Sequence, residues 1–118
     1  GSHNVKVGIQ DTFGRFRYWR NANGDIRAIF QNGAPFQATI LNTPLDYQDN
    51  LDADLGIYGQ DSWTVKRLTV NYGARWEYFA SSVNEAVSPA GRFVSERRFD
   101  RIEMPTWKTI APRVGLVY

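Results

Sequence analysis

A strict alternation of apolar and polar residues over two adjacent segments, 55–65 and 68–79, most constrains what this chain can fold into. In the first segment every second position is apolar except for one Gly and one Asp: Leu55, Ile57, Gly59, Asp61, Trp63 and Val65. In the second segment the alternate positions are all apolar: Leu68, Val70, Tyr72, Ala74, Trp76 and Tyr78. Successive side chains of a β-strand point to opposite faces, so a period of two predicts strands. Their proximity predicts an antiparallel hairpin.

The turn of this hairpin contains only Lys66 and Arg67. Neither residue favours the positive φ angles of a two-residue hairpin turn. We therefore expect the turn to include one further residue from each strand.

Further strands are expected over 4–13, 15–20, 26–31, 36–41 and 110–118. The pairs Asn23-Gly24 and Asn32-Gly33 supply the φ angles that tight turns require. Pro112 has no backbone donor, which predicts a strand start or a bulge at that position. The best helical candidate, 82–87, spans only a turn or two. The sequence therefore predicts an all-β fold, an antiparallel meander of long strands with two long loops.

The domain organisation is predicted as a single β unit over 1–118, with long loops at 14–54 and 80–109. The first loop is expected to contain short hairpins. Residues 1–3, Gly-Ser-His, fit the remnant of a cleaved purification tag and equally fit a strand entrance. The chain stops inside its last strand, which is how a fragment ends.

The length and patterning of the hairpin favour a membrane barrel. Its strands exceed the five or six residues usual in soluble sheets and match the roughly 9–11 that cross a bilayer at a tilt. Trp and Tyr near the strand ends suit an aromatic girdle, and the small polar residues of the other face suit a wet lumen. Long loops alternate with the short turn, as in outer-membrane barrels. The chain is therefore predicted to be part of an outer-membrane β-barrel wall.

The hairpin also resembles a known family, the TonB-dependent outer-membrane transporters and receptors. The resemblance rests on a Tyr-x-Gln-Asp-x-Trp strand followed by Leu-Thr-x-Asn-x-Gly-x-Arg-aromatic, here Tyr58, Gln60, Asp61, Trp63, Leu68, Thr69, Asn71, Gly73, Arg75 and Trp76. Residues 3–8 and 111–115 resemble the family's preceding and following strands, and the Oar-like branch is the most similar. This likeness implies a structural barrel segment in the bacterial outer membrane, partnered by lipid and by the rest of the barrel. It implies no catalysis and no cofactor.

A second reading from a different class remains open. The chain could be a soluble small β-domain, a ligand-binding or interaction module that self-associates through its apolar face. Four long strands cannot close a barrel, because the smallest natural ones have about eight. An isolated chain is therefore expected to self-associate or to adopt an unusual compact β-fold.

A candidate ligand-stacking set interleaves bases with aromatics: Arg15, Phe16, Arg17, Tyr18 and Trp19. Such residues stack on single-stranded nucleic acid or on sugars. A strand with exposed arginines and packed aromatics is the favoured interpretation. The net charge is +2, from 14 basic and 12 acidic residues, which attracts polyanions only weakly. No nucleic-acid partner is predicted.

Metal binding and catalysis find little support in the residues. Five oxygen-bearing residues could ligate calcium: Asp46, Asp49, Asn50, Asp52 and Asp54. They lack the central Gly and terminal Glu of an EF-hand, so a solvated loop is favoured. The chain has no cysteine and only one histidine, His3, which leaves no nucleophile pair. Asp61 and Glu77 are a formal acid–base pair, but Asp61 is expected to pair with a lumenal or turn-proximal base. The chain is not expected to be an enzyme.

Overall fold

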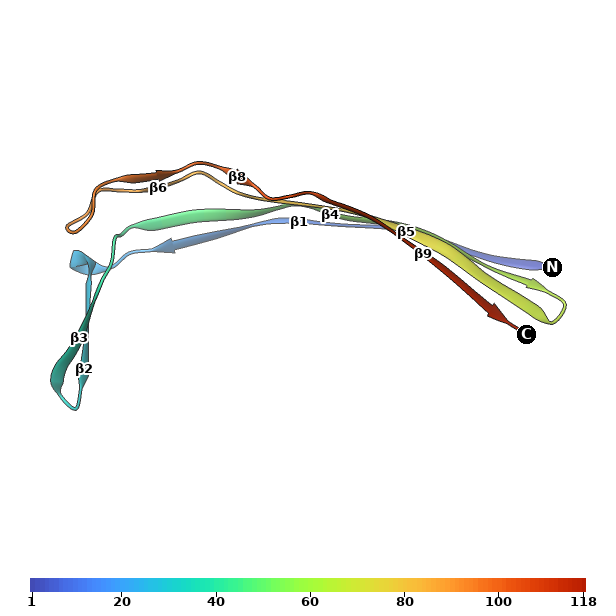
Figure 1. The fold of residues 1–118 in the computed structure, drawn as a ribbon, viewed down its shortest axis with the longest axis horizontal. Helices are drawn as coiled ribbons and strands as arrows, with labels where there is room; N and C mark the ends of the chain where they lie inside the picture. The colour runs from blue at the N-terminus through green and yellow to red at the C-terminus, as the bar shows by residue number, and fades with distance from the viewer. The chain divides into compact units, whose positions relative to one another are not determined.

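The computed structural model describes residues 1–118 and is almost entirely β (Figure 1). Its elements are β1 (Ser2–Arg20), a short 3-10 helix η1 (Asn23–Asp25), β2 (Ile26–Gln31), β3 (Ala34–Ile40), β4 (Leu45–Val65), β5 (Leu68–Val83), β6 (Ala86–Ser88), β7 (Arg97–Phe99), β8 (Ile102–Glu103) and β9 (Trp107–Val117). No helix in it is long and apolar enough to cross a membrane. The all-β prediction is confirmed.

The chain divides into two compact units, which are described separately. Unit 1 contains Gly1–Gly14, Leu51–Ser81 and Met104–Tyr118, and unit 2 contains Arg15–Asn50 and Ser82–Glu103. Unit 1 carries the predicted hairpin. Unit 2 carries most of the two segments that were predicted as long loops.

Unit 1 is an antiparallel sheet in which β1, β4, β5 and β9 lie side by side (Figure 1). The β5–β9 pairing runs without a register shift from Thr69 opposite Val117 to Phe79 opposite Trp107. Within this unit the N-terminus, the C-terminus and the β4–β5 turn lie at the same end. This is the meander that the alternation predicted.

Several strands are longer than predicted. β1 is one strand where two were expected, β4 begins at Leu45 instead of Leu55, and β5 continues to Val83. The added residues have no clean apolar alternation. Backbone pairing needs only a neighbouring strand, so the ladder continues where the side-chain pattern fades. The helical candidate at 82–87 is wrong, because β5 ends at Val83, two residues connect the strands, and β6 begins at Ala86.

Two local expectations are also corrected in unit 1. The β4–β5 turn is made by Lys66 and Arg67 alone, with Lys66 at a φ of 55°. Pro112 lies inside β9, opposite Ala74, and not at a strand start or bulge. β9 pairs with β5 only, and an edge strand tolerates proline where the missing donor faces away from its partner.

Unit 2 contains the last residues of β1, the first residues of β4 and the end of β5, together with short hairpins. β2 and β3 pair antiparallel through a turn at Asn32 and Gly33, whose φ angles are 51° and 78°. The prediction of a strand over 26–31 and of an Asn-Gly turn is confirmed. β6 pairs with β7, and β8 pairs with the end of β5. These last strands were not predicted, because two or three residues are too few to show a period.

Candidate functional site: the two faces of the sheet

The sheet of unit 1 sorts its side chains into an apolar face and a polar face. The β5–β9 register places Val70 opposite Leu116, Tyr72 opposite Val114 and Trp76 opposite Ile110. Directly opposed residues share a face, so these pairs form apolar rows across the strands. The intervening pairs are polar or small, as where Asn71 faces Gly115.

Side-chain contacts extend both faces across β4 and β1. The hydroxyls of Thr64 and Thr69 lie 3.1 Å apart on the polar face, next to the turn. The rings of His3 and Trp63 stack with centroids 5.6 Å apart and planes 8° from parallel. The apolar alternation of 55–65 and that of the first strand therefore meet in one continuous surface. We call this surface the apolar face.

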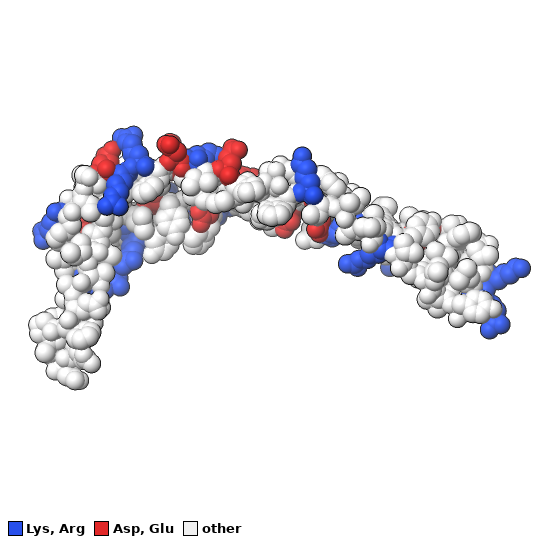
Figure 2. Space-filling view, in the orientation of Figure 1, with Lys and Arg blue, Asp and Glu red and all other residues white.

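The apolar face is not covered by any second layer of the protein. No hydrophobic side chain in the structure is buried. The exposed fraction is 77% for Val7 and Val114 and 70% for Ile110. Figure 2 shows an uncharged stretch of unit 1 between basic side chains at the β4–β5 turn end and charged side chains farther along the strands. A sheet of this kind has no core of its own.

The polar face holds an ion pair within β5 whose carboxylate also accepts a hydrogen bond from β9. The Nε atom of Arg75 donates a 2.7 Å hydrogen bond to Oε1 of Glu77. Thr109 of β9 donates to Oε2 of the same carboxylate over 3.3 Å. Glu77 is therefore engaged with Arg75 and not with Asp61, so the formal carboxylate pair of the sequence is not brought together.

Glycines on the polar face leave room for side chains or backbone of the neighbouring strand. A Cβ at Gly8 would clash with the ring of Tyr58, and one at Gly56 would clash with the guanidinium of Arg75. A Cβ at Gly73 would lie 2.6 Å from the backbone oxygen of Gly59. The motif glycine is thus required by a close approach to the backbone of the next strand.

The remaining motif residues line a shallow hollow of about 690 Å³ on the same sheet. Polar residues from all the long strands of unit 1 line it: Lys6, Tyr58, Gln60, Asp61, Ser62, Asn71, Tyr72, Arg75 and Arg113. The structure therefore gathers Tyr58, Gln60, Asn71, Gly73 and Arg75 on one face. Trp63, Leu68 and Trp76 lie on the other.

Asp61 is the exception on the apolar face. It is only 8% exposed, and three donors from two neighbouring strands surround it. Nδ1 of His3 lies 2.6 Å from Oδ2, the backbone N–H of Asn4 donates to Oδ1 over 3.1 Å, and the Tyr72 hydroxyl donates to Oδ2 over 2.8 Å. Sequence reasoning placed a base near Asp61 but did not identify these donors. The alternation alone does not give the register between β1 and β4, which decides the contact.

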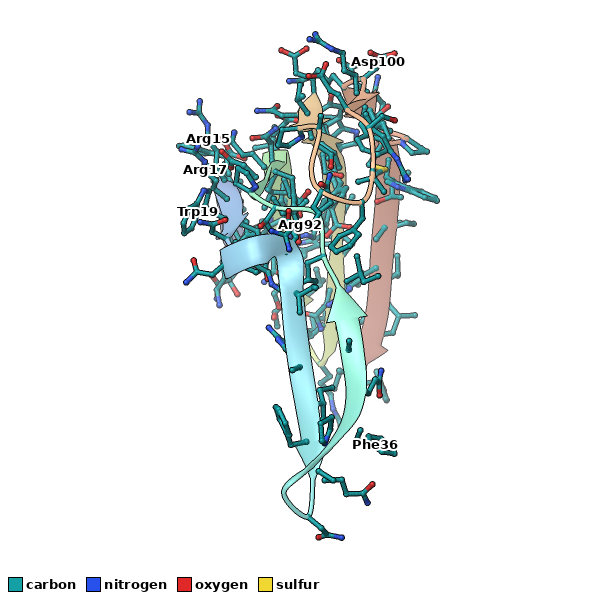
Figure 3. All side chains as sticks on the ribbon, turned by 90° about the vertical axis from the view of Figure 1, so that its left-hand side faces the viewer. Arg15, Arg17, Trp19, Phe36, Arg92 and Asp100 are labelled. Atoms are coloured by element: carbon teal, nitrogen blue, oxygen red, sulfur yellow. The ribbon has the colours of Figure 1, made fainter.

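The predicted stacking residues lie in unit 2 and are divided between the two sides of β1. Arg15, Arg17 and Trp19 project from one side (Figure 3), while Tyr18 stacks on Tyr47 with ring centroids 5.2 Å apart. Phe16, one residue after Arg15, is 60% exposed. Strand alternation separates neighbours in sequence, so the set does not form one surface.

Arg17 has an acidic partner on β4. Its Nε donates to Oδ1 of Asp46 over 2.8 Å, and a second guanidinium nitrogen contacts Oδ2. This hydrogen bond holds the pKa of Asp46 below its ordinary value. Two of the five calcium candidates are engaged elsewhere: Asp46 with Arg17, and Asn50 with Gln48 and Asn84. No group of three His, Cys, Asp or Glu residues is close enough to hold a metal ion.

Comparison with known proteins identifies the family. The family model described as TonB dependent receptor-like, beta-barrel, matches residues 1–118. No curated protein and no solved structure matches significantly. Because the match covers the whole sequence, the chain belongs to this family. The match does not distinguish branches of the family, so the Oar-like assignment stays a prediction.

Proposed function

We propose that this chain, a segment of the outer-membrane β-barrel of a TonB-dependent receptor, builds wall strands whose apolar face contacts lipid and whose polar face lines the lumen. The supporting observation is the absence of any buried hydrophobic side chain in a chain with a continuous apolar face. In water this surface would have to be covered, since exposed apolar area costs about 25 cal/mol per Å². A bilayer supplies the cover without a second protein layer.

The strands have one orientation that fits their connections. Outer-membrane barrels have short periplasmic turns and long extracellular loops. We assign the Lys66-Arg67 turn to the periplasmic side. The β2–β3 hairpin and the β6–β7 hairpin then belong to the extracellular side. Trp63 and His3 stack near the turn end, where an interfacial aromatic girdle would lie.

The segment contributes no catalysis of its own in this proposal. The family is one of receptors and transporters. The one His–Asp contact, between His3 and Asp61, joins β1 to β4 on the apolar face, and Asp61 also borders the hollow. No nucleophile stands beside it. A structural role accounts for the pair, because it satisfies a carboxylate on a surface that is otherwise apolar.

The predicted alternative, a soluble small β-domain, gains no support. It requires the apolar face to close against something, and residues such as Val7, Ile110 and Val114 are all more than two-thirds exposed. The rest of the barrel and outer-membrane lipid are the partners that we propose for the sheet.

Labelling of single cysteines placed at alternate positions tests which face of the sheet contacts lipid and which lines the lumen. The chain has no native cysteine, so single cysteines can be placed at Val70, Tyr72 and Ala74, or at Thr69, Asn71 and Arg75. The receptor containing this segment would be assembled in outer-membrane vesicles and treated with a membrane-impermeant maleimide. We expect labelling at the polar-face positions and protection at the apolar-face positions, with the receptor lacking these cysteines as background. Equal labelling of both sets in intact vesicles would refute the facing.

Self-association of the isolated chain is a separate expectation. Light scattering after size exclusion, with and without detergent, distinguishes the cases. We expect large assemblies in buffer and smaller, detergent-bound particles in micelles. A monodisperse monomer without detergent would contradict the membrane-wall account.

A further inference from the structure

A row of four residues crosses the polar face of unit 1 along the hollow. In β5 and β9, Gly73 lies directly opposite Arg113. In β4 and β5, the hydroxyls of Thr64 and Thr69 lie 3.1 Å apart beside the two-residue turn, so these two residues are opposed. Counting four residues along both strands from that pair places Gln60 opposite Gly73. The backbone of Gly73 and the side chain of Gln60 are indeed in close contact.

The first strand completes the row. The rings of His3 and Trp63 stack across β1 and β4, with planes 8° from parallel. The antiparallel register from this pair sets Lys6 opposite Gln60. Adjacent strands are about 4.8 Å apart, so the backbones of Lys6 and Arg113 are separated by three spacings, about 14 Å. A long basic side chain therefore stands at each end of the row, and both line the same hollow.

The polar face lines the hollow with hydrogen-bond donors and with no acidic side chain. Asp61 borders the hollow, but its carboxylate accepts from His3, Asn4 and Tyr72 on the apolar face. The side chains that line the hollow from the polar face can all donate a hydrogen bond: Lys6, Tyr58, Gln60, Ser62, Asn71, Arg75 and Arg113. The lining therefore has a net positive charge.

The two ends of the row carry the charges that the protein leaves unneutralised. Arg75 forms an ion pair with Glu77, which balances its charge. Neither Lys6 nor Arg113 takes part in any ion pair of unit 1. Charges of one sign in a hollow with low-dielectric walls attract ions of the opposite sign.

We propose that the hollow binds the phosphate or carboxylate group of an anionic solute, between Lys6 and Arg113 and above Gln60 and Gly73. Anionic oxygens accept hydrogen bonds, so they match a lining that supplies donors. The guanidinium of Arg113 fits two oxygens of such a group at once, and the ammonium of Lys6 adds a compact charge. This inference rests on the proposed function, in which the polar face lines the lumen and is reached from water.

The middle of the hollow is open because two of its residues have no side chain. Gly73 lies between Gln60 and Arg113 in the row, and Gly115 lies opposite Asn71. The volume of about 690 Å³ lies within the roughly 300–1,000 Å³ of small-molecule sites. The hollow therefore has room for a solute larger than the anionic group itself.

Acylation of lysine in the receptor containing this segment tests the proposal. The detergent-solubilised receptor would be treated with a water-soluble N-hydroxysuccinimide ester, and modification would be followed at each lysine by mass spectrometry. Lys66, at the β4–β5 turn and outside the hollow, is the reference amine in the same chain. We expect millimolar inorganic phosphate to slow acylation of Lys6 severalfold, compared with chloride at equal ionic strength. Acetate should slow it less, and Lys66 should be unaffected.

A pair of arginine variants tests the other end of the row. Arg113→Gln should reduce the protection of Lys6 by phosphate severalfold, because it removes a charge and the contact with two oxygens. The matched control is Arg67→Gln, which removes the same charge from the turn of the same sheet and should leave the protection intact. A full phosphate effect in Arg113→Gln would overturn the proposal, as would equal protection by phosphate and chloride.

A cysteine at Thr69 separates a failure of this inference from a failure of the proposed function. Thr69 lies on the polar face next to the turn and outside the hollow. If Thr69→Cys is labelled by the impermeant maleimide but phosphate does not alter acylation of Lys6, the anion site is wrong and the orientation of the sheet stands. The same holds if Lys6 stays unmodified in every buffer, because another part of the receptor then fills the hollow. Protection of Thr69→Cys would refute the orientation and the anion site together.

Discussion

The phenol of Tyr72 donates a 2.8 Å hydrogen bond to the Asp61 carboxylate of the neighbouring strand, on a face that is otherwise apolar. With His3 and Asn4 from the other side, this contact links β1, β4 and β5. We expect Asp61→Ala to lower the unfolding temperature of the assembled barrel more than Tyr72→Phe does. The first change leaves several donors without an acceptor, while the second removes one donor only.

The measurement for this comparison is the temperature at which the receptor loses its heat-modifiable mobility on a denaturing gel. Asp100→Ala is the control, because Asp100 is exposed and makes no contact with this cluster. Equal unfolding temperatures for Asp61→Ala and Asp100→Ala would show that the cluster contributes nothing to the wall.

Gly73 is required by the close approach of the next strand. A Cβ there would lie 2.6 Å from the backbone oxygen of Gly59, and paired backbone cannot move aside. We expect Gly73→Ala to destabilise the barrel by about 1–3 kcal/mol, as overpacking does. Gly115→Ala is the matched control on the same face, since its nearest neighbour would be 4.0 Å away.

Urea unfolding of the receptor in lipid vesicles measures both glycine variants. The expected change for Gly115→Ala is within about 0.5 kcal/mol. If Gly73→Ala were as well tolerated as Gly115→Ala, the close approach would not explain the motif glycine.

The Arg17–Asp46 contact predicts a pH dependence in unit 2. The hydrogen bond from Arg17 lowers the pKa of Asp46, so the folded state holds the ionised carboxylate more strongly than the unfolded chain does. Its contribution is therefore fully present above the ordinary carboxyl pKa of about 4 and is lost as the pH falls through the lower folded value. The effect is small, since the pair is exposed to solvent and to screening by salt.

Local hydrogen exchange near residues 17 and 46 measures this dependence between pH 7 and pH 3, after correction for the intrinsic exchange rate. We expect protection to fall in the acid range in the unsubstituted receptor and to be low and pH-independent in Asp46→Asn. The same acid response in both proteins would assign it to another group.

The hairpin could be predicted because its side chains alternate along both strands, with only Gly59 and Asp61 breaking the apolar positions. Val70 and Tyr72 lie on one face, and Asn71 and Gly73 lie on the other. The register with β9 has no shift, so each set stays on its own face. The sequence could not show the length of β4, since Gln48, Asp49 and Asn50 are polar on both faces and leave no apolar alternation.

Contacts between strands were less accessible to sequence reasoning than the strands themselves. His3 meets Asp61 across 58 positions of sequence, and only the register of β1 on β4 determines that. Asn42 and Asp25 are likewise unremarkable polar residues of predicted turns. The contacts of Asn42 with Ser88 and Pro89 depend on a hairpin, β6–β7, whose strands are too short to show a period.

Lys66 occupies a backbone conformation that its side chain disfavours. Its φ of 55° lies in the left-handed region, where a residue with a Cβ carries a penalty of about 1–2 kcal/mol. The two strands hold it there, because the turn has only two residues and strand residues flank it directly on both sides.

We expect Lys66→Gly or Lys66→Asn to stabilise the hairpin by about 0.5–1 kcal/mol. The gain is smaller for the glycine variant, because glycine also gains conformational freedom in the unfolded chain. Arg67→Asn is the control, since Arg67 has no positive φ. The measurement is the urea midpoint of unfolding of the vesicle-embedded receptor. A higher midpoint for Lys66→Asn but not for Arg67→Asn confirms the strain, and equal midpoints for the two variants contradict it.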